Sequence, residues 1–128
     1  GPIVRAVHAP SALLAPDGVE HPPALLRGRR VHALCGIARP GRFTQTLQSL
    51  GAIVTGVSAF PDHHFYAAAE LVVVGERARV EGAFLVTTEK DRVRLPGGFQ
   101  AWVLLLGVTI ESGEEHLDRL FAQPARTG

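Results

Sequence analysis

The chain has 128 residues, of which 46% are hydrophobic and 20% are charged, values typical of one globular domain. Its formal net charge of +1 argues against a nucleic-acid partner, since such proteins usually carry a strong basic excess. No apolar run approaches the ~18 residues of a membrane-spanning helix. The single cysteine, Cys35, excludes an internal disulfide and agrees with a reducing compartment.

The two ends of the sequence differ in character from the rest. Residues 1–2, Gly-Pro, are typical of the remnant that a protease leaves after cleavage, and residues 123–128 are expected to form a frayed tail. Between them, residues 3–122 are predicted to form a single α/β domain, because no repeat or low-complexity tract divides them.

The predicted elements begin with a strand. Residues 3–8 alternate in polarity as a strand does, whereas residues 9–23 hold four of the nine prolines and are predicted to be turns and irregular backbone. Within them, Asp17-Gly18 is typical of a tight hairpin at a sheet edge. Further along, short apolar runs predict four more strands, at residues 31–35, 53–58, 83–87 and 101–106.

Helical periodicity fills the intervals between these strands. A helix is predicted at residues 42–50 and a second at 67–81, each followed by a glycine suited to a helix end, and a short helix or turn at 89–95. The faces expected to be buried carry Phe43, Leu47 and Leu50 in the first helix and Leu71, Val74 and Ala78 in the second. A last helix is predicted from the capping box Ser112–Glu115, with Leu117, Leu120 and Phe121 facing the core.

This order predicts an α/β fold. We expect a small, mostly parallel sheet with helices on both faces, a three-layer, Rossmann-like arrangement with a hairpin at its N-terminal edge. Residues 101–106 are apolar throughout, as a buried parallel strand should be.

The most distinctive motif is Phe60-Pro-Asp-His-His-Phe-Tyr66, between a predicted strand and a predicted helix. Ligands in open α/β folds bind just outside the carboxyl ends of strands, so a site is expected here. A histidine oriented by a carboxylate can hold or move a proton, which makes His63 and Asp62 catalytic candidates supported by His64 and Tyr66. The alternative is structural, with Asp62 capping the following helix and the histidines in its first turn.

A second candidate is Lys90, the only lysine in a chain with twelve arginines. It follows the predicted strand at 83–87 in the turn Thr87-Thr-Glu-Lys-Asp91, so Glu89 and Asp91 are candidate supporting residues. A lysine is a compact point charge, whereas arginine is a planar fork, and a tight anion site can favour the former. Lys90 is therefore a candidate for binding substrate or phosphate, and the alternative is an ion pair with a neighbouring acid.

Parallel α/β domains often bind nucleotides, which makes phosphate-binding motifs relevant. Neither Gly-x-x-x-x-Gly-Lys-Ser/Thr nor Gly-x-Gly-x-x-Gly occurs in the chain. The turn at residues 36–41 precedes a helix, where backbone N–H groups together with Arg39 and Arg42 can attract an anion. A plain tight turn with solvated arginines is the alternative.

A metal site is also considered at Asp62-His63-His64. Adjacent histidines on one turn rarely reach the same ion, and structural zinc needs four ligands. A small metal-dependent hydrolase that uses Asp62, His63 and Cys35 therefore stays open only as a minor alternative, and no metal ligand is predicted.

Four motifs together resemble a known family. They are Leu34-Cys-Gly-Ile-Ala-Arg-Pro-Gly-Arg-Phe43, Thr46-Leu-Gln-Ser-Leu-Gly51, Phe60-Pro-Asp-His-His-Phe-Tyr66 and Leu85-Val-Thr-Thr-Glu-Lys-Asp-Arg-Val-Arg-Leu-Pro96. In order and spacing, over residues 3–121, they look like the C-terminal part of tetraacyldisaccharide 4′-kinase, the lipid A 4′-kinase. Ala38 departs from the family, which often has glycine in that turn.

The resemblance implies a kinase of lipid A and lipopolysaccharide biosynthesis. Such an enzyme transfers the γ-phosphate of ATP, with Mg²⁺, to the 4′-hydroxyl of an acylated glucosamine disaccharide 1-phosphate. It works at the cytoplasmic side of the bacterial inner membrane, in a cleft between two α/β domains. The histidine that follows the aspartate in its Phe-Pro-Asp-His motif corresponds to His63, and is thought to pair with an aspartate of the N-terminal domain.

The same resemblance implies that this chain lacks the N-terminal ATP-binding domain. That domain holds the phosphate loop, the acids that bind Mg²⁺ and the aspartate partner, so the chain alone is expected to bind no cofactor and to have no turnover. The alternatives from other classes are a stand-alone binding or regulatory module on the same fold and the metal-dependent hydrolase.

Overall fold

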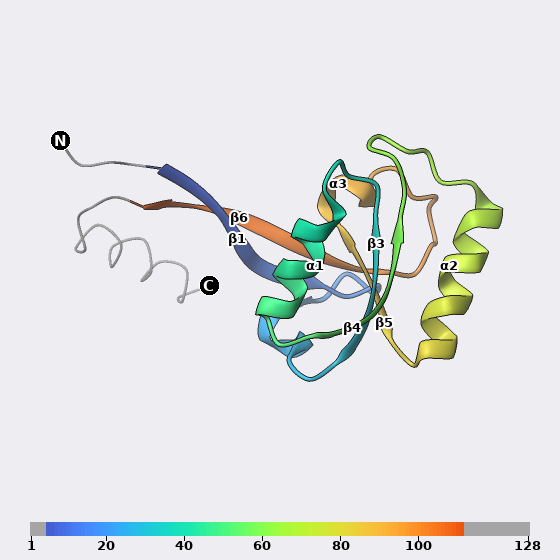
Figure 1. Cartoon of the computed structure of the whole chain (residues 1–128), viewed down its shortest axis with the longest axis horizontal. Coiled ribbons are helices and arrows are strands. Elements are labelled where there is room, and N and C mark those ends of the chain that lie inside the picture. Colours follow the sequence, from blue (N-terminus) through green and yellow to red (C-terminus); the bar gives the residue numbers. More distant parts are fainter. Residues whose placement is uncertain (1–4, 112–128) are drawn as a thin grey trace. The chain divides into compact units, whose positions relative to one another are not determined.

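The structure, a computed structural model, describes residues 5–111, with side chains for residues 9–107. In chain order the elements are β1 (Arg5–Leu14), β2 (Glu20–His21), the 3-10 helix η1 (Pro23–Leu26), β3 (Arg30–Cys35), α1 (Pro40–Ser49), β4 (Ile53–Ala59), α2 (Ala68–Glu81), β5 (Phe84–Thr88), α3 (Glu89–Arg92) and β6 (Trp102–Glu111) (Figure 1). Residues 10–105 form one compact unit, which holds the core and the candidate site, and the outer ends of β1 and β6 belong to a second unit.

The strands form one mixed sheet in the order β2-β1-β6-β5-β3-β4. Strand β3 pairs in parallel with β4 on one side and β5 on the other, and β5 pairs in parallel with β6. At the opposite edge β1 and β2 form the expected antiparallel hairpin, in which Leu13 lies opposite His21 and Gly18 adopts a φ of +89° in the turn. The prediction of a mostly parallel sheet with an N-terminal edge hairpin is confirmed.

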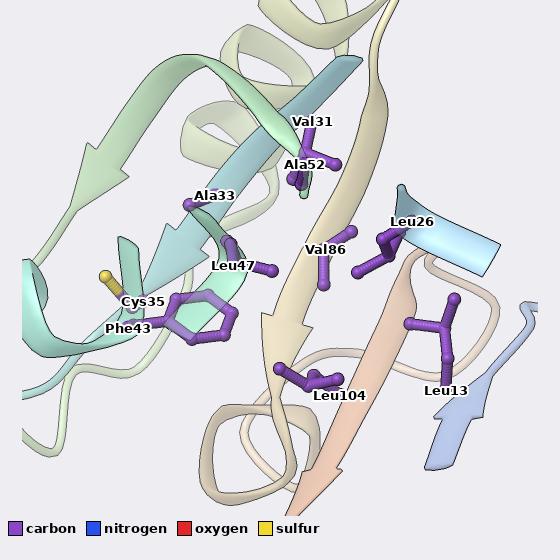
Figure 2. Packing of buried hydrophobic residues seen from close by; sticks show 10 residues of the cluster. All are labelled: Leu13, Leu26, Val31, Ala33, Cys35, Phe43, Leu47, Ala52, Val86 and Leu104. Carbon is purple, nitrogen blue, oxygen red and sulfur yellow. The ribbon is translucent and has the colours of Figure 1, made fainter. Parts of the chain in front are cut away.

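The two longer helices cover opposite faces of the sheet because β3 alternates in the direction of its side chains. Val31, Ala33 and Cys35 point into a cluster with Phe43 and Leu47 of α1 (Figure 2). Leu34 points the other way, into a cluster with the buried α2 residues Leu71, Val74 and Ala78. The helix faces predicted from periodicity are the buried ones, and the three-layer arrangement is confirmed.

The helix ends follow local rules of backbone chemistry. Helix α1 begins at Pro40, two residues before the predicted start, because proline is well suited to the first helical turn. Gly51 and Gly82 follow α1 and α2 with φ of +87° and +64°, the left-handed conformation that glycine adopts at little cost.

The largest differences from the predicted boundaries are in β6 and β1. Strand β6 runs to Glu111, five residues beyond its predicted end at residue 106. Residues 9–14, expected to be irregular because of their prolines, continue strand β1, and Leu13 is fully buried. The burial of Leu13 favours the extended strand although the segment contains Pro10. The helix predicted from Ser112 lies outside the described residues. Within the described part of the chain, no helix has both the length and the apolar character needed to cross a membrane.

Candidate functional site

The candidate site lies where the parallel strands end. The loop that joins β4 to α2 carries the Asp62-His63-His64 motif, α3 begins directly after β5, and Gly36 follows β3. Because the carboxyl ends of parallel strands meet at one edge of a sheet, these three connections come together there.

A buried carboxylate, Asp91, joins the three connections. Its Oδ1 accepts hydrogen bonds from the backbone N–H of Gly36 and from the phenol of Tyr66, each at 3.0 Å. Its Oδ2 accepts a bond of 2.6 Å from the hydroxyl of Thr88, whose Oγ1 in turn caps α3 by accepting from the Asp91 N–H. With several donors on a side chain that has no solvent exposure, Asp91 is a satisfied buried acid that supports the site structurally.

The turn that carries His63 has an unusual backbone. The His64 N–H bonds the Pro61 carbonyl at 3.1 Å, which closes a four-residue turn, and His63 at its third position has a φ of +63°. Among the described residues it is the only non-glycine residue with positive φ. Positive φ at this position is the type II pattern, which ordinarily takes glycine or asparagine, and it costs other residues about 1 kcal/mol or more. Such a cost marks His63 as a residue held in place by its surroundings.

Two side chains contact the imidazole of His63, which is 69% exposed, and a third side chain bonds one of the two. Arg94 donates from Nη2 to Nδ1 across 2.7 Å, and the carboxylate of Asp62 lies 3.6 Å from Nε2. Lys90 donates to the other oxygen of Asp62 at 2.7 Å, and this hydrogen bond is the largest reason why the pKa of Asp62 lies below its usual value. Asp62 is thus an ionised neighbour of His63 and does not cap α2.

His64 and Tyr66 belong to an aromatic cluster behind the turn. Phe60 stacks on His64 with ring centroids 4.8 Å apart, and both meet Tyr66 edge to face. His64 also bonds Glu70 at 2.8 Å, while Glu70 accepts from the Ala67 N–H at the start of α2. The Ala67 bond, followed by the one from His64, lowers the pKa of Glu70. The side chain of Glu70 therefore caps the start of α2, and His64 is hydrogen-bonded to Glu70.

The remaining predicted residues are not joined to this cluster. Arg39, Arg42 and Glu89 are exposed, and no hydrogen bond or ion pair links them to His63, Asp62 or Lys90 in the described part of the chain. Arg39 and Arg42 lie at the start of α1, and Glu89 is the first residue of α3.

The geometry does not favour a metal centre. Within residues 9–107, no group of three or more His, Cys, Asp or Glu side chains is arranged to hold an ion. Cys35 packs between sheet and α1 in the hydrophobic cluster, and its burial, followed by the charge of Asp91, raises the pKa of its thiol to about 11 (Figure 2). A buried, protonated thiol is a poor partner for the exposed Asp62 and His63 in a hydrolase.

Two features were not predicted from the sequence. Arg94 was one of twelve arginines, and nothing in its neighbours marked it as the partner of His63. A partly buried network between β3, β4 and the end of α2 was also missed. His32, only 1% exposed, bonds Ser58 at 2.7 Å and Glu81 at 2.8 Å, and Glu81 also accepts from Thr55 at 2.6 Å. An isolated polar residue inside an apolar strand, as His32 is, was the available signal.

Comparison with known proteins identifies one family for this chain. The family model described as LpxK, tetraacyldisaccharide-1-P 4′-kinase, matches residues 1–125. Among curated proteins, the tetraacyldisaccharide 4′-kinases of Methylobacterium nodulans and Rhodospirillum centenum are 42% and 43% identical over 99% and 94% of this chain. The chain spans only 35% and 34% of those two relatives.

A solved structure agrees with this match. The LpxK protein of Aquifex aeolicus, determined in complex with ATP, superimposes with a TM-score of 0.54 at 27% identity, over 94% of this chain and 35% of its own length. The sequence and structure comparisons agree, and the chain belongs to the tetraacyldisaccharide-1-P 4′-kinase family.

Proposed function

We propose that this chain is the C-terminal part of a lipid A biosynthesis kinase, and that it supplies the His63 side of the active site. The full enzyme transfers the γ-phosphate of ATP to the 4′-hydroxyl of a tetraacyldisaccharide 1-phosphate. The observation that carries the proposal is the family match over residues 1–125, together with the placement of His63 on a constrained turn at the carboxyl edge of the sheet. Relatives about three times as long bear the kinase name.

Phosphoryl transfer needs a cradle for the phosphates and a metal ion that neutralises their charge. The chain has no phosphate-loop motif, and its described residues do not form a cluster of acids suited to Mg²⁺. We assign these parts to an N-terminal domain of the full enzyme; the solved relative was determined in complex with ATP, and this chain covers only 35% of its length. The chain by itself is therefore proposed to lack turnover.

His63 is the residue assigned to acid–base work. Because Arg94 donates to Nδ1, the proton of the neutral imidazole is on Nε2, which lies 3.6 Å from the Asp62 carboxylate, beyond hydrogen-bond distance. An Nε2–H group can donate to a carboxylate of the facing domain and orient it for activation of the sugar hydroxyl. His63 then acts from an exposed position, as an interdomain site requires.

The remaining assignments come from the family. The acceptor is an acylated glucosamine disaccharide 1-phosphate, and the full enzyme is assigned to the cytoplasmic face of the bacterial inner membrane as a peripheral protein. No nucleic-acid partner is proposed.

A chimera tests the proposal directly. The C-terminal 35% of the Methylobacterium nodulans kinase is replaced by this chain, with which it is 42% identical, and ATP consumption that depends on the disaccharide and Mg²⁺ is measured. We expect turnover from the chimera and none from the isolated chain. Turnover by the isolated chain would refute the division of the site. A chimera that folds and binds ATP but never phosphorylates the disaccharide would refute the kinase assignment.

A further inference from the structure

The segment that begins with α3 sends two side chains to the turn that carries His63. Lys90, on α3, donates to Asp62, and Arg94, just after α3, donates to His63, each across 2.7 Å. The two donors are four residues apart, and the two acceptors are adjacent. Because Asp62 also lies 3.6 Å from Nε2 of His63, the four side chains form a continuous series of contacts between the two loops, from Lys90 through Asp62 and His63 to Arg94.

The turn needs such support. Its own hydrogen bond, from the His64 N–H to the Pro61 carbonyl, closes the loop, but histidine at positive φ remains unfavourable there. The side chain of His63 is mostly exposed, so core packing does not hold it. The contacts from Lys90 and Arg94 are the interactions in the described structure that hold the Asp62–His63 pair from outside the turn.

The bond from Arg94 also determines which ring nitrogen of the neutral His63 carries the proton. A guanidinium has donors only, so Nδ1 must accept through its lone pair and Nε2 must carry the proton of the neutral ring. Nη1 of Arg94 is buried without a hydrogen-bond partner among the described residues, so the guanidinium is partly buried and its bond to His63 is made by Nη2. The ring of His63 is therefore fixed in orientation and tautomer by one neighbour.

The segment that carries Lys90 and Arg94 is itself anchored to the core. Asp91 lies between them in the sequence, is fully buried, and is bonded to Gly36, Tyr66 and Thr88. The backbone of Arg94 continues the turn by donating to the Asp91 carbonyl at 2.9 Å. The backbone segment from which Lys90 and Arg94 extend is thus anchored to the core by Asp91.

We propose that Lys90 and Arg94 are positioning residues that clamp the His63 turn, with Arg94 also selecting the Nε2–H tautomer. This assignment replaces substrate or phosphate binding as the role of Lys90. Its structural part stands on the contacts alone, and its kinetic consequence rests on the proposed function.

Nuclear magnetic resonance of the complete 128-residue chain tests the structural part. A residue with φ near +60° has a short distance between its own amide and α hydrogens, which gives a strong intraresidue cross-peak. We expect this cross-peak at His63, and a hydrogen-bonded, unprotonated Nδ1 in ring ¹⁵N spectra, in the parent chain. Arg94→Met and Lys90→Met should weaken the cross-peak, and Arg94→Met should also change the Nδ1 resonance.

Arg92→Met is the matched control, since it removes the same charge from an exposed position of α3. It should leave the His63 signals unchanged. Unchanged His63 signals in both Arg94→Met and Lys90→Met would overturn the clamp. If Arg94→Met does not fold, Lys90→Met still tests the proposal, because Lys90 is exposed. Lys90→Arg is expected to restore the His63 signals.

Steady-state kinetics of the chimera test the expected effect of Lys90 and Arg94 on catalysis. Misplacement of a reacting group lowers kcat, so Lys90→Met and Arg94→Met should each reduce kcat by ~10- to 100-fold with little change in KM for the disaccharide. A raised KM with unchanged kcat would assign Lys90 to substrate binding and overturn the positioning role. A parent chimera that folds and binds ATP but is inactive would refute the kinase assignment, and the magnetic-resonance result would still decide whether Lys90 and Arg94 hold the turn.

Discussion

Tyr66 donates its phenolic hydrogen to the buried carboxylate of Asp91 across 3.0 Å, and so joins the loop after β4 to α3. Burial, followed by the hydrogen bond and charge of Asp91, raises the pKa of the Tyr66 phenol well above its usual range. The same carboxylate receives the Gly36 N–H, so a single acid holds the ends of three strands together.

Tyr66→Phe should destabilise the chain without changing its fold. The substitution removes one donor from a buried carboxylate but leaves the bonds from Gly36 and Thr88, so a loss of about 1–3 kcal/mol is expected. Urea denaturation followed by circular dichroism measures the change. Phe65→Ala is the control, because that neighbouring aromatic side chain is 82% exposed and its removal should cost little. Equal stability of Tyr66→Phe and the parent chain would show that the Tyr66–Asp91 bond has no net effect.

Gly36→Ala should also be destabilising, for a steric reason. A Cβ at this position would lie 2.9 Å from the Tyr66 hydroxyl, 3.0 Å from Asp91 Oδ1 and 3.1 Å from the Pro61 carbonyl. Relieving three such contacts around a buried carboxylate should cost about 1–3 kcal/mol in the free energy of unfolding. Gly75→Ala in α2 is the opposite case, since nothing lies within 4 Å of its added Cβ. It should stabilise the chain by up to about 1 kcal/mol through helix propensity, and the same sign for both variants would contradict the steric argument.

Glu81→Gln should change how stability depends on pH. Burial raises the pKa of Glu81, but the hydrogen bonds from Thr55 and His32 outweigh it, so the folded pKa lies below the ordinary value of 4.5. A depressed folded pKa adds stability above the unfolded pKa, and this stability is lost as the pH falls through the folded pKa. At pH 6–7 the parent chain should therefore exceed Glu81→Gln by about 1.5 kcal/mol, and the difference should shrink towards pH 3. If the difference in stability between the two proteins stays constant from pH 7 to pH 3, the ionised form of Glu81 does not stabilise the chain.

His63→Ala in the chimera should lower kcat by ~10²–10⁴-fold, the usual range for a general acid or base. His64→Ala is the contrasting variant, because His64 stacks on Phe60 and bonds Glu70 behind the turn. His64→Ala should reduce thermal stability and have a smaller effect on kcat than His63→Ala. Steady-state kinetics and thermal unfolding of both variants separate the roles, and an unchanged kcat in His63→Ala would leave His63 as a structural residue.

Local patterns in the sequence determined the elements and their buried faces. Periodicity in apolar residues is sufficient to place Leu71, Val74 and Ala78 on the core side of α2, and glycines mark both long helices' ends. The position of Asp62-His63 after a strand indicated the correct edge of the sheet, because that edge follows from strand direction alone. Residues 9–14 were misjudged, since proline is a local signal for a turn while the burial of Leu13 is a tertiary effect.

The partners within the site were decided only by the tertiary structure. Lys90 lies 28 residues from Asp62, and Arg94 lies 31 residues from His63, so no local spacing rule links them. Asp91 looks like an ordinary acid of a short helix until the Gly36 N–H and the Tyr66 phenol are seen to point at it. The sequence by itself determined which residue types stand at the ends of the strands. Which of them bond one another depended on how three loops, separate in the chain, converge at one edge of the sheet.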